Sequence, residues 1–204
     1  MFTVMSPRAY QQRARAASHA RTREQILDAT IALLEEVGFA ATTIAAIAAR
    51  AGIQRLTVYR HFPDDRVLID GCAARWRALH PMPSDRWSAI ADPRQRVRIA
   101  VDSLYGFYAT ADPMLAQLMR ERERIPSVAR WLEPYNRLLA ELGERLAEGW
   151  GLSGRPRAWL DALITHVLSV GAWRSLVRDA GLAPADASRL MARSVADLAR
   201  DPYA

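Results

Sequence analysis

Apolar residues recur along most of the chain at intervals of three and four positions, the spacing that places them on one face of an α-helix. No segment alternates convincingly between apolar and polar residues, as a half-buried strand would. Glycine and proline residues divide the helical pattern into about nine segments. The predicted helices begin at Thr22, Ile44, Arg55, Arg66, Pro93, Pro113, Pro126, Pro156 and Pro184. The sequence therefore predicts an all-α chain.

Capping residues set the expected helix boundaries. Thr22 and Gln25 have the spacing of a capping box, which predicts a helix that begins at Thr22. Gly38 is placed to end that helix in the left-handed conformation. Other side chains suited to N-caps precede later helices: Thr42 or Thr43, Asp64, Asp92 and Asp112. Asp92 and Asp112 are each followed by a proline, which favours a new helix at both places.

Two short predicted helices, 44–50 and 55–61, are separated by a turn at Gly52 and follow a longer helix. This arrangement is typical of a helix-turn-helix, in which the second short helix enters the major groove of DNA. Val58 and Phe62 share one face and are expected to anchor that helix on the core. The residues expected to point outward in varying degree are Arg55, Thr57, Tyr59, Arg60 and His61.

Each outward residue has a chemistry that suits DNA. Arg55 can read guanine through two hydrogen bonds, and Thr57 can contact a phosphate or a thymine methyl group. Thr43 lies at a helix N-terminus, where free amides favour a phosphate. The residues expected to hold phosphates and fix the register are Tyr59, Arg60 and His61.

Charge supports this interpretation. The chain has a net charge of +6, and all 28 basic residues are arginines. Residues 1–23 contain five arginines and no acidic residue, which is typical of a tail that binds a polyanion. We expect residues 1–21 to form a basic, disordered arm.

Other classes of protein find little support. The single cysteine, Cys72, excludes an internal disulfide, and no apolar run reaches the length of a membrane span, so a cytoplasmic location is expected. There is no glycine-rich phosphate loop, and the four histidines lack metal-ligand spacing. We therefore expect no cofactor, no metal ion and no enzymatic activity. An all-helical enzyme with an incidental helix-turn-helix remains the alternative.

The run from Gly38-Phe39 and Thr42-Thr43-Ile44 through Ala51-Gly52-Ile53 to Tyr59-Arg60-His61-Phe62 resembles the DNA-binding region of the tetracycline-repressor (TetR) family. The resemblance covers residues 22–70. It implies DNA contacts by Thr42, Thr43, Gln54, Arg55, Leu56, Thr57, Tyr59, Arg60 and His61. Three positions depart from the family pattern, and the first two put the base preference in question: Gln54, Leu56 and Asp65.

The same resemblance implies an organisation. Residues 22–65 form a three-helix DNA-binding domain, and residues 66–204 a larger helical domain for ligand binding and dimerisation. It also implies a homodimer that binds a near-palindromic operator of double-stranded DNA. A small-molecule effector in the C-terminal domain lowers the affinity for DNA, so the protein is expected to act as a repressor. Helix 66–79 joins both parts and is the expected lever.

The last two predicted helices, 156–179 and 184–199, are those that form the dimer bundle in the family. One apolar stripe consists of Leu160, Ile164, Val167, Leu168 and Gly171. The other consists of Leu190, Met191, Ser194, Val195 and Leu198. The alternative is that these stripes only pack within the monomer.

Aromatic residues gather in the second half of the sequence and indicate an apolar ligand pocket. We expect it to be lined by Tyr108, Met119, Trp131, Tyr135, His166 and Trp173. The alternative for each of these residues is that it belongs to the core. In that case the protein is a DNA-binding protein that responds to nothing or to a partner protein.

Overall fold

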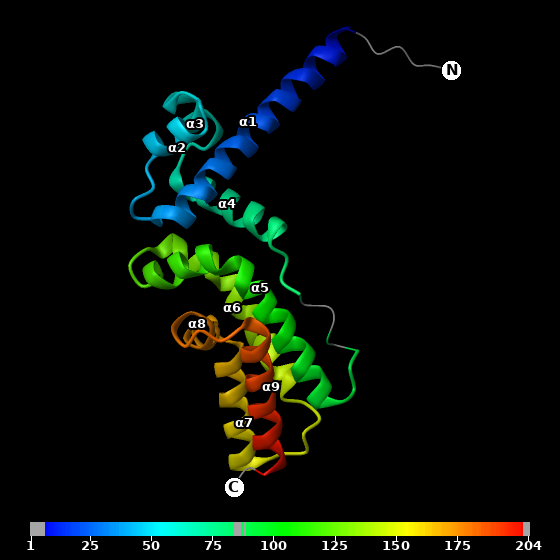
Figure 1. The fold of residues 1–204 in the computed structure, drawn as a ribbon. Coiled ribbons are helices and arrows are strands. Elements are labelled where there is room, and N and C mark those ends of the chain that lie inside the picture. Colours follow the sequence, from blue (N-terminus) through cyan, green and yellow to red (C-terminus); the bar gives the residue numbers. More distant parts are fainter. Residues whose placement is uncertain (1–6, 84–86, 88, 202–204) are drawn as a thin grey trace, which may run out of the picture.

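The structure is a computed structural model that describes residues 7–83, 87 and 89–201. Within those ranges all regular elements are helical, which confirms the predicted all-α fold (Figure 1). The elements are α1 Pro7–Val37, α2 Ile44–Arg50, α3 Arg55–His61, α4 Asp65–Leu79, α5 Pro93–Glu121, α6 Pro126–Leu146, α7 Gly154–Leu168, α8 Val170–Arg174, a π-helical turn Ser175–Asp179, and α9 Pro184–Arg200. No helix in these ranges has both the length and the apolarity to cross a membrane.

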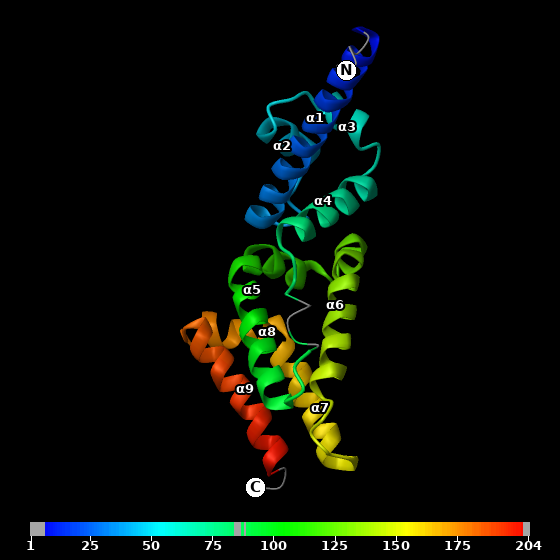
Figure 2. The same ribbon diagram turned by 90° about the vertical axis from the view of Figure 1, so that its right-hand side faces the viewer.

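The helices form two groups along the long axis of the molecule. Helices α1 to α3 lie at one end, α5 to α9 form the other part, and α4 lies between the two (Figures 1 and 2). Helix α4 packs on α1 on one side and on α6 on the other, while α5 packs against α9 along much of its length. Helix α4 is therefore in direct contact with both groups.

Several helix starts agree with their sequence signals. The side chain of Thr43 accepts a hydrogen bond from the Ala46 amide, and that of Asp64 accepts one from the Val67 amide. Asp92 accepts from the amides of Arg94 and Gln95, with Pro93 in the first turn. These hydrogen bonds confirm the predicted caps of α2, α4 and α5. Each cap joins residues at most three positions apart, so the local sequence is sufficient to predict it.

Helix α1 begins at Pro7, fifteen residues before the predicted start. The capping-box prediction at Thr22 is wrong, because the Thr22 hydroxyl donates to the Ser18 carbonyl inside a continuous helix. Alanine, arginine and glutamine, which are strong helix formers, dominate residues 8–21 and no helix breaker interrupts them. The predicted disordered arm is therefore helical from residue 7 to residue 21, and residues 1–6 lie outside the described part of the chain.

A second correction concerns Asp112 and Pro113, which were expected to begin a new helix. Helix α5 continues through Pro113 and changes direction along its length (Figure 2). The Asp112 side chain caps nothing and instead binds the guanidinium groups of Arg174 and Arg178. Pro113 is exposed, so its ring is accommodated on the solvent side, where a proline bends the helix.

The predicted helix 156–179 is broken at Ser169, whose backbone is extended (φ −75°, ψ 142°). The Ser169 hydroxyl donates to the His166 carbonyl at 2.7 Å and accepts from the Ala172 amide at 3.1 Å. Serine side chains compete in this way for backbone groups and favour helix starts over helix interiors. A single serine thus separates α7 from α8.

The apolar stripe on α7 packs inside the chain. Leu160, Ile164, Val167 and Leu168 are each at most 2% exposed. Helix α7 makes these contacts mainly with α6 and α9. The expectation that this stripe is free for a dimer partner is therefore wrong, and the alternative of packing within the monomer holds for it. On α9 the stripe is divided, since Val195 is buried and Leu190 is 45% exposed.

Candidate DNA interface and ligand cavity

The turn between α2 and α3 is fixed by its own backbone and by α1. Gly52 adopts φ +64°, a conformation that glycine reaches without strain. The amide of Ile53 donates to the Ala48 carbonyl at 3.0 Å, which closes the end of α2. The Gln25 side chain of α1 donates to the Ala51 carbonyl at 2.8 Å. The angle between the two short helices is thus held from both sides.

Helix α3 is anchored by the two residues that its sequence pattern selected. Val58 is fully buried and Phe62 is 2% exposed. The guanidinium group of Arg23 lies 4.2 Å from the centre of the Phe62 ring and donates a hydrogen bond to the His61 carbonyl. Burial of such side chains contributes roughly 1.5–3 kcal/mol each. The opposite face of α3 is therefore presented to solvent in a fixed orientation.

Most of the predicted DNA-contacting residues lie on that solvent face or beside it. Leu56 is 75% exposed and Tyr59 is 52% exposed. The other exposed members of the set are Thr43, Gln54, Arg55 and Arg60. Thr42 and Thr57 are half-buried, and the Thr42 hydroxyl donates to the Gly38 carbonyl at 2.7 Å. The structure brings these residues to one end of the molecule (Figure 1).

His61 departs from the expectation that it points outward to a phosphate. It is only 7% exposed, and its ring lies 4.1 Å from that of His19 on α1. Burial lowers the pKa of His61, and the nearby charges of His19, Arg60 and Arg23 act in the same direction. The ring faces inward because His61 and Val58 are three positions apart and share the anchoring side of α3. His61 is therefore a packing residue.

The basic segment ahead of the helix-turn-helix extends α1 away from the rest of the molecule (Figure 1). All side chains from Tyr10 to Arg21 are exposed, including Arg13, Arg15 and Arg21. Because the His19 ring lies against that of His61 on α3, this segment leaves the domain beside the candidate DNA-contacting helix. The exposed positive charge and the outer face of α3 therefore lie at the same end of the molecule.

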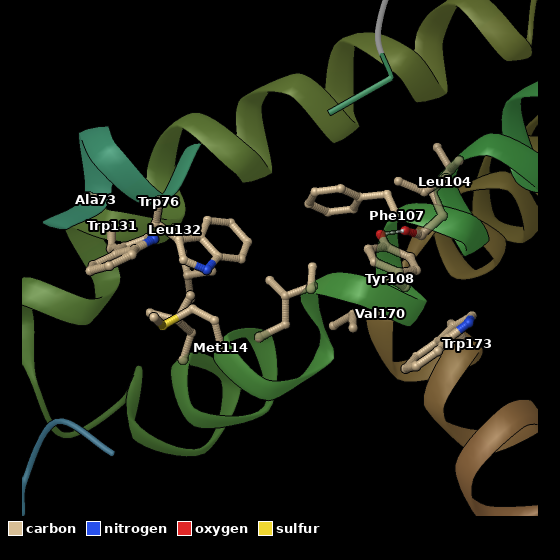
Figure 3. Packing of buried hydrophobic residues seen from close by; sticks show 14 of the residues in the cluster. Ala73, Trp76, Leu104, Phe107, Tyr108, Met114, Trp131, Leu132, Val170 and Trp173 are labelled. Carbon is tan, nitrogen blue, oxygen red and sulfur yellow. Dashed lines mark hydrogen bonds between the residues drawn. The ribbon is translucent and has the colours of Figure 1, made fainter. Parts of the chain in front are cut away.

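A cavity of about 270 Å³ lies between α4, α5 and α6. Its wall is mostly apolar and carries four aromatic rings. The lining residues are Trp76, Arg77, His80, Met82, Phe107, Leu115, Leu118, Trp131, Leu132, Pro134, Tyr135 and Leu138. Figure 3 shows Trp76 of α4 beside Trp131 and Leu132 of α6, away from Tyr108 and Trp173.

Of the six residues predicted to line a pocket, Trp131 and Tyr135 line this cavity. Tyr108 lies behind it, where its hydroxyl is 2.7 Å from that of Tyr135. Trp173 is fully buried with its ring 6.0 Å from that of Tyr108. Met119 is half-buried without lining the cavity, and His166 is exposed on α7. The six residues are thus not brought together in one site.

The sequence interpretation missed the contribution of α4 and of its C-cap residue, which supply Trp76, Arg77 and His80. A signal was present, because Trp76 and His80 are four residues apart on a helix and therefore share a face. Their rings are in fact stacked, with centres 4.4 Å apart. Phe107 of α5 was also missed; it lines the cavity, whereas its neighbour Tyr108 does not.

Direct contacts join the cavity wall to the helix-turn-helix domain. The indole nitrogen of Trp76 donates to the Glu35 side chain of α1 at 3.1 Å. The ring of Trp131 meets that of Phe39 edge to face, with centres 5.6 Å apart. At the end of α5, the Glu121 carboxylate accepts hydrogen bonds from the Phe39 amide at 2.8 Å and the Ala40 amide at 3.3 Å. Residues that line the cavity therefore touch α1 and the loop that follows it.

The Cys72 thiol and possible metal-binding clusters were the remaining candidates for reactive chemistry. Burial raises the pKa of the Cys72 thiol to about 12, so the thiol remains protonated at neutral pH. In the described part of the chain, no three His, Cys, Asp or Glu side chains are grouped so as to hold a metal ion.

Comparison with known proteins assigns the family. Residues 26–70 match the family model described as bacterial regulatory proteins, tetR family. The chain is 30% identical over 145 residues to the HTH-type transcriptional regulator BetI of Stenotrophomonas maltophilia, covering 61% of this chain and 72% of that one. The chain belongs to the TetR family. The helix-turn-helix of this TetR protein coincides with the segment that the family model matches.

Other relatives match a shorter part of this TetR chain. BetI of Paraburkholderia xenovorans is 31% identical over 98 residues, which are 46% of this chain and 49% of that one. AqdR of Rhodococcus erythropolis is 40% identical over 65 residues, 31% of each chain. With the first of these relatives, the match spans about half of the relative's length.

Solved structures extend the likeness to the whole fold. A TetR-family regulator from Mesorhizobium loti superimposes with a TM-score of 0.63 at 19% identity, covering 89% of this chain and 97% of that one. A regulator from Saccharomonospora viridis, solved in complex with choline, gives a TM-score of 0.59 at 19% identity, with 89% and 97% covered. At these identities the likeness concerns the fold alone.

Proposed function

We propose that the protein is a DNA-binding transcriptional repressor that a small hydrophobic or aromatic ligand releases from its operator. The observation that carries this proposal is the contact between the domain that bears α3 and the wall of the cavity. An anchored recognition helix exposes Arg55, Tyr59 and Arg60, and the domain that holds it is bonded to the wall of an aromatic cavity. Membership of the TetR family supports the same function.

On DNA, α3 enters the major groove and its N-terminal residues reach base edges. Arg55 donates to guanine, and Leu56 offers an apolar contact to a thymine methyl group. An exposed leucine at this place favours a thymine-containing site, because its burial against DNA removes apolar surface from water. Tyr59 and Arg60 bind phosphates and set the register.

The proposed repressor acts as a homodimer built on the outer face of α9, because the apolar stripe of α7 is buried within the monomer. The exposed Leu190 and the half-buried Met191 and Leu198 supply apolar surface on α9. A twofold axis at this end places two recognition helices in successive major grooves, about 34–36 Å apart, on a near-palindromic operator. The proposed location of the protein is the cytoplasm, which contains the DNA.

The ligand releases the repressor from DNA through α4. A ligand in the cavity touches Trp76, whose indole is bonded to Glu35 of α1, and Trp131, which packs on Phe39. Occupation shifts the helix-turn-helix domain relative to the dimer, so that the spacing of the two recognition helices no longer matches the operator.

Two alternative functions are less well supported. The rival with a pocket filled by core side chains is disfavoured by the cavity between α4, α5 and α6. The all-helical enzyme would need acids or several histidines in that cavity. Its described lining contains one histidine, His80, and no carboxylate, so this alternative gains no support.

The test is DNA binding by alanine variants of α3, measured by gel shift on the operator and on random DNA. Tyr59→Ala and Arg60→Ala should weaken binding to both DNAs, whereas Arg55→Ala should weaken operator binding by about tenfold and change random binding little. Arg66→Ala, a change of an exposed arginine on α4, serves as the control. An equal loss for Arg55→Ala on both DNAs refutes its role in base reading.

A further inference from the structure

The mostly apolar wall of the cavity between α4, α5 and α6 includes one arginine side chain. We infer that this cavity takes an organic anion with a flat apolar body, whose carboxylate or similar headgroup is held by Arg77. This inference rests on the proposed function in that it names the ligand class of the same cavity. It deepens that proposal, because the hydrophobic ligand acquires a charge and an orientation.

Arg77 is the group that selects the charge. It lies near the end of α4 and lines the cavity, yet it forms no ion pair or hydrogen bond within the described residues. Arg75, two positions earlier on the same helix, is in contrast held by the Asp28 carboxylate of α1. A guanidinium group without a protein partner at the wall of an apolar cavity is suited to a carboxylate, which it binds through two parallel hydrogen bonds.

Arg77 is exposed, and no acidic side chain of the described cavity lining accompanies it. The described lining of the cavity contains no aspartate and no glutamate. The C-cap residue of α4, His80, is also titratable and lines the cavity, and its ring nitrogen Nδ1 lies 3.0 Å from the Trp76 carbonyl. A ligand that carries an ammonium group would meet a guanidinium charge with no acidic partner in the described lining. Although aromatic walls attract quaternary ammonium groups, Arg77 opposes them here.

The aromatic rings select the shape of the body. Trp76 is central to them, with its ring 6.5 Å from Trp131 and 6.3 Å from Phe107, both edge to face. Flat apolar groups pack well against such rings. The volume of about 270 Å³ is small for a ligand site, where about 300–1,000 Å³ is usual, so one or two fused rings suit it better than a long chain.

Tyr135 at the other side of the cavity fixes the orientation of the ligand. The Tyr108 hydroxyl donates its proton to the Leu168 carbonyl at 2.5 Å. The 2.7 Å bond between the two tyrosines therefore takes its proton from Tyr135, which leaves only lone pairs of Tyr135 for a ligand. Burial raises the pKa of Tyr135 to about 12, so this hydroxyl does not ionise at neutral pH. A carboxylate is repelled by those lone pairs and turns toward Arg77.

The test compares three probes that share one ring system and differ in charge: naphthylacetate, naphthylacetamide and naphthylethylammonium. Their affinities for the full chain are measured by isothermal titration calorimetry. We expect naphthylacetate to bind tightest, about tenfold more tightly than the ammonium probe, with the amide between them. Arg77→Gln should remove most of this difference. The matched control is Arg145→Gln, a change of an exposed arginine of α6 outside the cavity, which should leave the difference intact.

Three results would overturn the inference: equal or tighter binding of the ammonium probe, an unchanged preference in Arg77→Gln, or no heat from naphthylacetate at millimolar concentration. Gel shifts on the same samples separate the two proposals. If the carboxylate binds through Arg77 and operator affinity stays constant, the ligand class stands and release by ligand fails. If the chain binds no DNA, the regulator proposal fails while calorimetry still decides the ligand class.

Discussion

Neighbouring residues of α3 have opposite environments that their side chains alone do not reveal. Tyr59 and His61 are two positions apart, yet Tyr59 is 52% exposed and His61 is 7% exposed. The Nδ1 atom of His61 is buried without a hydrogen-bond partner in the described structure. A proton on this ring would add charge beside Arg23 and Arg60. The ring is thus suited to packing against His19 in its neutral form.

This environment predicts a pH dependence of stability. Because the pKa of His61 is lowered from its ordinary value of 6.5, the unfolded chain takes up a proton at a higher pH than the folded one. Stability should therefore be lost as the pH falls through 6.5 toward the lowered pKa, and kept above 6.5. Thermal unfolding of His61→Phe between about pH 7.5 and about pH 5.5 should show a smaller fall in Tm than that of the native chain.

His166→Gln is the control for this measurement, because His166 is exposed on α7. Its fall in Tm should equal that of the native chain. A fall in His61→Phe as large as in the native chain would show that the buried ring does not govern the effect.

Between elements, the junction of α1 with α5 is built around one carboxylate. Glu121 at the end of α5 accepts from the amides of Phe39 and Ala40, and Gln117 donates to the Glu35 carbonyl at 3.2 Å. Gly38 admits Glu121, since a Cβ at position 38 would lie 2.7 Å from the Glu121 Oε1 atom. This contact ties the loop before α2 to the cavity-bearing part of the chain.

Removal of that carboxylate should loosen the junction. We expect Glu121→Ala to lower the free energy of unfolding by about 1–2 kcal/mol, because two backbone amides lose a charged acceptor. It should also reduce the loss of operator affinity caused by naphthylacetate, because the two parts are then less firmly joined. Urea unfolding and gel shifts measure the two effects.

Glu123→Ala, at an exposed position two residues later, should do neither. If Glu121→Ala were as stable and as responsive to ligand as the Glu123 variant, α5 would have no part in coupling.

Across the whole molecule, positive charge is concentrated at the end that carries α3. The exposed arm of α1 bears Arg13, Arg15 and Arg21, and the described residues from 10 to 23 include no acid. A rigid helix holds these charges in fixed positions, whereas a disordered arm would spread them. The arm therefore presents a defined surface to the phosphate backbone beside the site of α3.

Replacement of all three arm arginines by glutamine should weaken binding to operator and random DNA to a similar extent. The slope of log K against log salt should become shallower by about 0.9 for each phosphate contact that is lost. Fluorescence anisotropy at several salt concentrations measures this slope.

A variant with the same loss of charge elsewhere, Arg94, Arg98 and Arg145 to glutamine, is the control. These exposed arginines lie at the start of α5 and the end of α6, away from α3 (Figure 1). Equal slopes in the two triple variants would exclude a direct role of the arm.

The helix-turn-helix and most helix starts follow from the amino-acid sequence alone. These features depend on interactions within a few residues, such as the cap from Thr43 to Ala46, the turn at Gly52 and the shared face of Val58 and Phe62. Local signals of this kind act in the same way wherever the segment lies in the fold, so they can be interpreted without it. The break at Ser169 had such a signal as well, an N-cap serine, which the apolar periodicity concealed.

The path of α5 through Pro113, the burial of His61 and the composition of the cavity depend instead on the packing of helices distant in sequence. Asp112 binds Arg174, 62 residues away, and this pairing supports a continuous helix where its sequence favoured a start. The cavity takes Trp76, Phe107 and Trp131 from three different helices. Contacts over such separations depend on how whole helices pack, and the spacing of residues within one helix does not specify its partners.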